Sequence, residues 1–125
     1  MIAWQKAMDL ARLAYEHTEG FPNSETFGLR MQIRRSAVSV ASRIAEAHGR
    51  LNDVEMRKGL GSGRAALKEL ETQIDLAKSL AFFQPGVAEM LLDLSSEGGK
   101  LINGLIGVLA RNRADLLTCR SAKRC

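Results

Sequence analysis

The sequence predicts an all-α protein, an antiparallel up-down-up-down four-helix bundle. Apolar residues recur every three or four positions along four long segments, which is the spacing of one face of a helix. The breaks between these segments are short and contain Gly, Pro or Asn, so that successive helices must be antiparallel neighbours. With 125 residues, of which 46% are hydrophobic and 26% charged, the chain suits one domain with its own core.

The first helix is expected over residues 2–18. Its apolar positions at helical spacing are Trp4, Met8, Ala11 and Tyr15. A Gly-Phe-Pro-Asn stretch follows at residues 20–23. Gly relieves strain at a helix C-terminus and Pro cannot continue the preceding helix, so this stretch forms the first turn.

The second helix is expected over residues 24–47 and carries two apolar strips. The wider strip, which suits the core of the bundle, consists of Ile33, Ala37, Val40, Ile44 and Ala47. A second strip of small residues lies beside it, at Val38, Ala41 and Ala45. A helix with two such strips can face its own core and a neighbouring molecule. These three residues are therefore predicted to lie at an oligomer interface.

The third helix is expected over residues 53–81. Asn52 and Glu55 resemble a capping box at its start. A heptad-like seam of apolar and small residues follows, at Leu60, Gly63, Leu67, Leu70, Ile74, Ala77 and Ala81. The sequence Phe-Phe-Gln-Pro-Gly at residues 82–86 forms the next break.

The fourth helix is expected over residues 87–110, with the same three-four rhythm. Four glycines lie within it, at Gly98, Gly99, Gly104 and Gly107. Each lowers helix propensity by up to ~1 kcal/mol relative to Ala, so a close approach of helices or subunits is expected to offset the cost. The stripe is lost over residues 111–125, which hold five basic residues and one acidic residue. This segment is predicted to be a basic, mostly disordered tail.

Catalytic chemistry is not indicated by any motif. His17 and His48 have no partner at a suitable spacing, and the only cysteines, Cys119 and Cys125, lie in the tail. The Glu-x-x-His motif of di-iron bundles is absent. We therefore expect no enzyme, no metal and no cofactor. The chain has neither a signal peptide nor a membrane-spanning apolar run, which together with the cysteine usage predicts a cytoplasmic protein with no membrane partner.

Basic residues are concentrated in the second helix and at the start of the third, in a chain of net charge +4, and they are the charged residues that indicate a function. The candidate nucleic-acid-binding residues are Arg30, Arg34, Arg35, Arg43, Arg50, Arg57 and Lys58. Such a strip is typical of a phosphate-binding face. It is equally consistent with a solubilising surface and ion pairs between helices. In the second interpretation Glu46, the single carboxylate between Arg30 and Arg50, is a buried structural partner of an arginine.

Several short motifs together resemble one bacterial family of four-helix bundles. They are Trp4-Gln5-Lys6-Ala7-Met8-Asp9-Leu10-Ala11, Phe21-Pro22, Phe27-Gly28-Leu29, Arg34-Arg35-Ser36-Ala37, Ile44-Ala45-Glu46 and Glu69-Leu70-Glu71-Thr72-Gln73. The family includes proteins encoded within intervening sequences of 23S rRNA genes and the accessory variability determinant of diversity-generating retroelements. The resemblance covers residues 2–110, and it departs from the family pattern at Arg43 and Ala47, where the family usually has Asn and Gly.

This resemblance implies an up-down-up-down bundle that assembles as a homopentamer and has no catalytic activity. It also implies a basic surface for RNA or DNA, and a reverse transcriptase as partner where the gene belongs to a retroelement. The sequence thus suggests a non-enzymatic, homo-oligomeric nucleic-acid-binding accessory protein. The alternative is a structural or protein-interaction module whose arginines serve packing and ion pairing.

Overall fold

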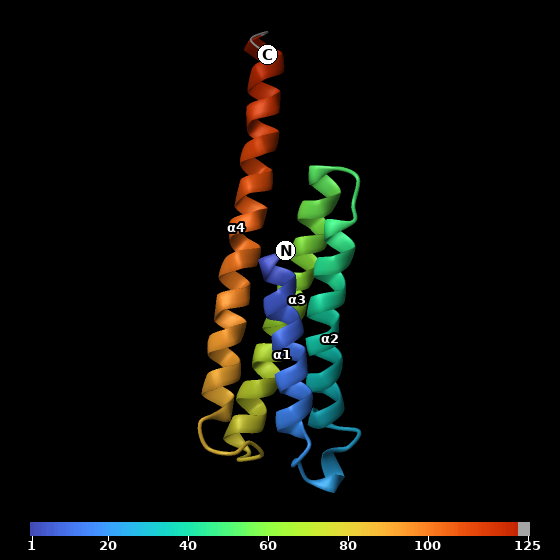
Figure 1. Cartoon of the computed structure of the whole chain (residues 1–125), viewed down its shortest axis with the longest axis vertical. Coiled ribbons are helices and arrows are strands. Elements are labelled where there is room, and N and C mark those ends of the chain that lie inside the picture. Colours follow the sequence, from blue (N-terminus) through green and yellow to red (C-terminus); the bar gives the residue numbers. More distant parts are fainter. Residues whose placement is uncertain (123–125) are drawn as a thin grey trace.

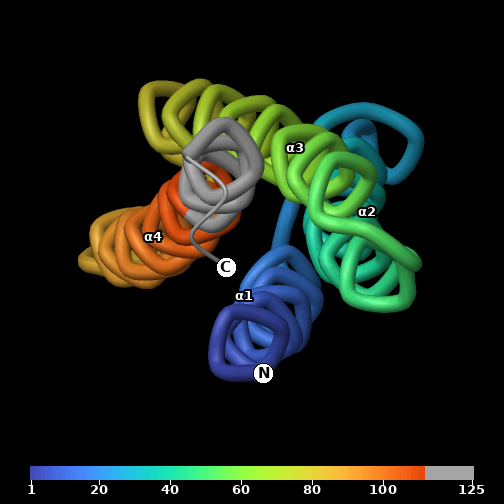
Figure 2. Tube along the Cα trace, turned by 90° about the horizontal axis from the view of Figure 1, so that it is seen from above, coloured from blue at the N-terminus to red at the C-terminus, as the bar shows by residue number. Residues whose placement is uncertain are grey.

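The computed structural model describes the backbone of residues 1–122 and the side chains of residues 1–111. Four α-helices run alternately up and down along one long axis, which confirms the predicted antiparallel four-helix bundle (Figure 1). Each helix packs against the next in sequence, and α1 also packs against α4, so the four helices enclose one core (Figure 2). The largest fully buried side chains are Ile33, Ile44, Leu60, Leu67, Leu70, Ile74, Leu91 and Ile102.

Helix α1 spans Ile2–Thr18, as predicted. The turn after it places Phe21 at the end of the bundle that holds the α1–α2 and α3–α4 connections, where its side chain is 4% exposed. Its ring centroid lies 5.5 Å from that of Phe82 and 5.0 Å from that of Phe83. Aromatic pairs at these distances attract one another beyond the area that they bury. This cluster therefore closes the end of the core at which α1 joins α2 and α3 joins α4.

Helix α2 spans Leu29–His48, so the prediction that it begins at residue 24 is wrong by five residues. Asn23–Glu25 form a short 3-10 helix, η1, and Gly28 is the N-cap of α2 with φ −101° and ψ −125°. The helix cannot run back through Gly28, because that residue is not in a helical conformation. The polar segment at 24–28 is consequently a separate turn.

Helix α3 spans Asp53–Ser79 and begins as predicted, with the Asn52 side chain accepting a hydrogen bond from the Glu55 N–H. It ends two residues earlier than predicted because Ala81 has φ 59°, in the left-handed region. The N–H of Phe82 donates to the carbonyl of Ala77, and the N–H of Ala81 donates to that of Lys78, each at 3.0 Å. These two bonds form a Schellman motif, which satisfies the last carbonyls of the helix.

Gly59 of α3 packs closely against Ala47 of α2. A Cβ atom placed on Gly59 would lie 2.7 Å from the Cβ of Ala47. Such an atom does not fit, so glycine at this position lets the two backbones approach one another. The fully buried Ala47 and Ile44 lie beside this contact.

Helix α4 spans Val87–Ala122, so the prediction that the fourth helix ends at residue 110 is wrong. The residues after Arg111 include Ala and Leu, which are good helix formers, and neither Gly nor Pro, so loss of the apolar stripe does not end the helix. The helix is ~54 Å long at 1.5 Å per residue and continues past the α2–α3 turn (Figure 1). Residues 123–125 lie outside the described residues, and the division into a bundle and a separate tail stays a prediction.

Candidate nucleic-acid interface

The predicted arginines fall into two groups, and the first group packs against α1. Arg34 donates through Nε to the Thr18 hydroxyl at 2.9 Å and through Nη2 to the Tyr15 carbonyl at 3.0 Å. The same Nη2 lies 2.8 Å from Glu19 Oε2, and Nη2 of Arg30 lies 3.0 Å from that oxygen. The guanidinium of Arg34 also lies 4.6 Å from the centre of the Tyr15 ring. Arg30 and Arg34 therefore join the end of α1 to the start of α2.

Glu19 is the carboxylate at the centre of this cluster. The hydrogen bond from Arg34, and next the charge of Arg30, lower the pKa of Glu19 below its ordinary value of 4.5. The hydroxyl of Thr18 is fully buried and donates to the Ala14 carbonyl at 2.8 Å, which fixes the oxygen that accepts from Arg34. This first group thus has a structural role, as the ion-pairing interpretation predicted for part of the set.

Glu46 does not have the role predicted for it. Its side chain is exposed, and no arginine among residues 1–111 forms an ion pair with it. The prediction that it is a buried partner within the chain is wrong, because its position in the second helix points it away from the core. The carboxylate that pairs with arginines is Glu19, at the end of α1.

The second group of predicted cations lies toward the α2–α3 turn. Arg43 donates to the hydroxyls of Ser39 at 2.9 Å and Ser62 at 2.6 Å. Lys58 lies 3.5 Å from Glu55 and forms an ion pair with it. Arg50 and Arg57 have no ion pair with any carboxylate of residues 1–111. Arg35 is also exposed and without an ion pair in that range, but it lies beside Arg34 in the other half of the bundle.

Three further cations lie in the same half as the second group and are not among the residues predicted from the sequence to bind nucleic acid. Arg64 donates to Asn103 Oδ1 at 3.0 Å and therefore stands where α3 faces α4. Lys100 and Arg111 are exposed on α4. None of these three side chains forms an ion pair within the described part of the chain. The spacing in the sequence could have predicted Arg64, because it follows Arg57 by seven residues and so lies on the same helix face.

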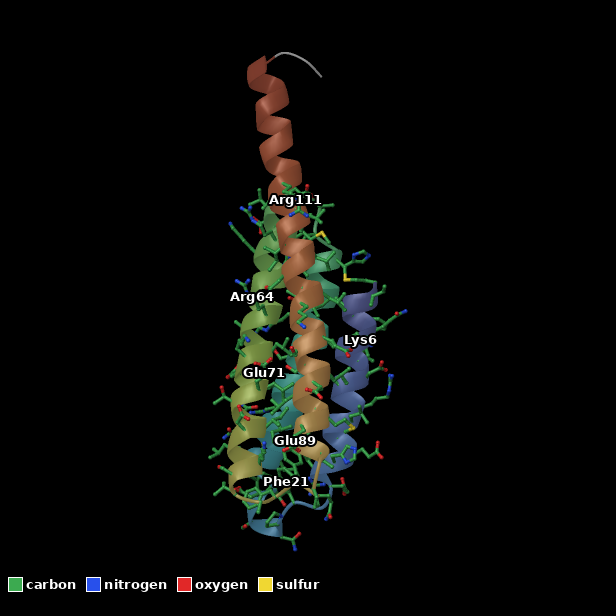
Figure 3. The ribbon with its side chains drawn as sticks, turned by 90° about the vertical axis from the view of Figure 1, so that its left-hand side faces the viewer. Lys6, Phe21, Arg64, Glu71, Glu89 and Arg111 are labelled. Carbon is green, nitrogen blue, oxygen red and sulfur yellow. The ribbon has the colours of Figure 1, made fainter. Side chains whose placement is uncertain are left out.

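Charge is therefore divided along the bundle axis. The described cations without an ion pair, apart from Arg35, lie between mid-height and the α2–α3 turn. They are Arg43, Arg50, Arg57, Arg64, Lys100 and Arg111. We call this region the basic half. The opposite half holds seven of the thirteen carboxylates of residues 1–111, namely Glu16, Glu19, Glu25, Glu71, Asp75, Glu89 and Asp93, while Glu46, Asp53 and Glu55 lie near the α2–α3 turn. Figure 3 shows the division, with Arg64 and Arg111 above Glu71 and Glu89.

The strip predicted at an oligomer interface is only partly exposed. Val38 is 44% exposed and Ala45 is also exposed, whereas Ala41 is 6% exposed and belongs to the core. Ala45 and His48 line one depression together with Met1, the N-cap of α1, and Trp4, which is 39% exposed. The outer face of α1 and α2 thus presents apolar side chains from both helices.

Groups that could hold a metal ion are not found among the described residues, in which no three His, Cys, Asp or Glu side chains come together. Cys119 and Cys125 lie outside the described side chains. Among the described residues, none of the helices combines the length and the apolar character that a membrane span requires.

Comparison with known proteins identifies the family. A crystal structure of a protein of unknown function from the S23 ribosomal protein family of Bacteroides thetaiotaomicron superposes with a TM-score of 0.74 at 21% sequence identity. The match covers 83% of this chain and 97% of that one, which shows that the two share a fold. No curated protein matches the sequence. The family described as 23S rRNA-intervening sequence protein matches residues 1–104, and the chain therefore belongs to that family.

Proposed function

We propose that this protein is a non-enzymatic, homo-oligomeric accessory protein that binds nucleic acid, RNA in particular, through phosphate contacts. The observation that carries the proposal is the basic half, where six described cations have no ion pair among residues 1–111. Guanidinium and ammonium groups without a protein counter-charge are available to bind phosphates and release their counterions. The family description, which names 23S rRNA, favours RNA over DNA.

The ion pairs of Arg30 and Arg34 make these two arginines poorer candidates for nucleic-acid binding than the other predicted residues. Arg30 and Arg34 are about four-fifths buried, and both pair with Glu19. Their substitution would disturb the α1–α2 contact, so loss of binding in such variants would not identify an interface. Arg43, Arg50 and Arg57 lie in the basic half and can be substituted without breaking an ion pair within residues 1–111.

The test is RNA binding by nuclease-treated protein of known mass, titrated against salt. We expect the logarithm of affinity to fall linearly with the logarithm of salt concentration, with a slope of about −0.7 per phosphate contacted on a single strand. A slope that corresponds to several contacts supports the proposal. Absence of binding at low salt would exclude nucleic acid as the ligand.

The second candidate function is a protein-interaction module, favoured by the apolar outer face of α1 and α2. Trp4, Val38 and Ala45 are exposed there. The same face suits self-association, for which the family resemblance implies a pentamer. A protein that forms a stable oligomer but binds no nucleic acid would support this second function.

A further inference from the structure

The face between α3 and α4 contains a shallow groove of about 320 Å³. Arg64 and Lys68 of α3 line one side, and Gly99, Lys100 and Asn103 of α4 line the other. Figure 3 looks onto α4 with α3 beside it, and Arg64 lies on α3 at mid-height. The groove thus lies where the basic half begins.

Arg64 is held at the rim of this groove. Its Nη1 donates to Asn103 Oδ1 at 3.0 Å, which links the two walls and orients the guanidinium. An arginine donates five N–H groups in a fixed plane, so the remaining groups are available to a ligand. Because this hydrogen bond restrains the side chain, less side-chain entropy is lost when a phosphate binds there than for an unrestrained arginine.

The one carboxylate lining the groove is already occupied. Glu71 accepts a hydrogen bond from the fully buried Ser95 hydroxyl at 2.7 Å, and Lys68 lies 3.3 Å from its other oxygen. Both carboxylate oxygens of Glu71 therefore already have partners within the protein. Lys100 and Arg64 face no ion-pairing carboxylate within residues 1–111, and the groove keeps an excess of positive charge.

Above the groove, two positions of α4 between a pair of cations are glycines. Lys100, Gly104, Gly107 and Arg111 are spaced by four, three and four residues, which places them on one helix face. Apart from the nearby backbone of α4 itself, no atom lies within 4 Å of a Cβ built on Gly104, and one built on Gly107 would meet Arg111 Nη1 at 3.4 Å. A phosphate chain can therefore approach the backbone of α4 closely at Gly104, between Lys100 and the Arg111 guanidinium that lies over Gly107.

Resting on the nucleic-acid function proposed above, we infer that the α3–α4 groove and the Lys100–Arg111 face of α4 bind the phosphodiester backbone of double-helical RNA. The described side chains that line the groove include no aromatic ring on which an unpaired base could stack. Recognition by cations and an open backbone is the mode that suits a duplex, whose bases are already paired and stacked. Binding through this surface is consequently independent of base sequence.

The experiment compares two charge-matched double variants for binding to one RNA duplex and to a single strand of equal length. Arg64→Gln with Lys100→Gln removes two charges from the groove. Arg12→Gln with Lys78→Gln removes two charges from exposed ion pairs outside it. We expect the groove variant to bind duplex at least about tenfold more weakly and to lose about two from the salt slope. The control should bind like the wild type.

A second pair of variants tests the bare face of α4 without a change of charge. Gly104→Gln should weaken duplex binding severalfold by placing a side chain in the approach path, while Gly104→Ala should bind like the wild type. Melting temperatures check that both remain folded. Wild-type binding by the groove variant, or tighter binding of the single strand than of the duplex, would overturn this inference and leave the nucleic-acid function standing. Absence of binding by the wild type would remove both.

Discussion

Arg34 shows how one side chain can join two helices. It donates to a hydroxyl, a backbone carbonyl and a carboxylate, and its guanidinium covers Tyr15. All of these partners lie on α1 or directly after it, and the side chain is only 19% exposed. Arg34→Ala should therefore destabilise the protein by about 2 kcal/mol, the usual worth of a charge-assisted hydrogen bond. Chemical denaturation measures the change, and Arg35→Ala is the matched control with an expected change below about 0.5 kcal/mol.

Glu19 should make stability depend on pH in the acidic range. Its pKa is lowered in the folded protein, so its contribution is fully present above its ordinary pKa of 4.5 and is lost as the pH falls through the lower, folded value. Wild type should be more stable than Glu19→Gln at pH 7, and the two should converge as the pH falls below 4.5. Melting curves of both proteins between these conditions test this, and a constant difference would contradict it.

Pairing between residues far apart in the chain could not be predicted from the sequence. The choice of Glu46 as the arginine partner relied on closeness in sequence, whereas Glu19 and Arg34 are 15 residues apart. Their meeting depends on where α1 ends and how the turn at Phe21 folds back. Neither the turn geometry nor the later start of α2 is contained in the apolar periodicity, which predicted the core stripe of α2 correctly.

The end of α3 offers a test at the scale of one helix. Ala81 adopts a left-handed conformation that costs an L-residue roughly 1 kcal/mol and costs glycine much less. Ala81→Gly should consequently stabilise the protein by up to about 1 kcal/mol, because the Schellman hydrogen bonds are already formed. Thermal unfolding measures the gain. A loss of stability would mean that flexibility of the unfolded chain outweighs the relief of strain.

Two glycines in different helices should respond oppositely to the same substitution. Gly59→Ala places a Cβ 2.7 Å from that of Ala47, and overpacking of this kind costs ~1–3 kcal/mol, more than the ~1 kcal/mol gained in helix propensity. Gly104→Ala meets no atom within 4 Å and should keep the gain in propensity. We expect the first variant to melt below wild type and the second above it. Equal shifts would show that packing at Gly59 is not tight.

The helices themselves were largely predictable, and their ends were not. Periodicity and turn residues gave α1, the start of α3 and the start of α4 within a residue. The start of α2 depends on the conformation of Gly28, and α4 extends to Ala122 after its apolar stripe has ended. Glycines of α4 were expected at close contacts, yet Gly98 and Gly104 have no atom within 4 Å of a Cβ position.

At the scale of the whole molecule, we predict that copies associate through the outer face of α1 and α2. Ala45 is exposed beside Trp4, so Ala45→Arg should disrupt an oligomer while leaving the fold of each chain intact. Ser42→Arg adds the same charge at an exposed position of α2 and should not change the mass in solution. Sedimentation measures both. A wild-type mass for Ala45→Arg would place the subunit contact elsewhere.

Only part of the candidate nucleic-acid interface could be predicted from the sequence, because its residues come from segments that are distant in the chain. Counting basic residues along the second helix grouped Arg30 and Arg34 with Arg43 and Arg50. The two pairs differ because Arg30 and Arg34 form ion pairs with Glu19 at the end of α1, a contact that the sequence does not reveal. Arg64, Lys100 and Arg111 belong to segments distant in sequence, and their gathering in one half follows from the antiparallel connection of α3 to α4.

The division of charge along the axis gives the bundle an electric dipole moment parallel to its length. In the field of a polyanion such a particle experiences a torque before any contact forms, and its α2–α3 end turns to lead. For the nucleic-acid partner proposed above, we expect encounters to begin in a productive orientation, which raises the association rate constant. Added salt shortens the range of that field. Ionic strength should consequently slow complex formation far more than it speeds complex decay.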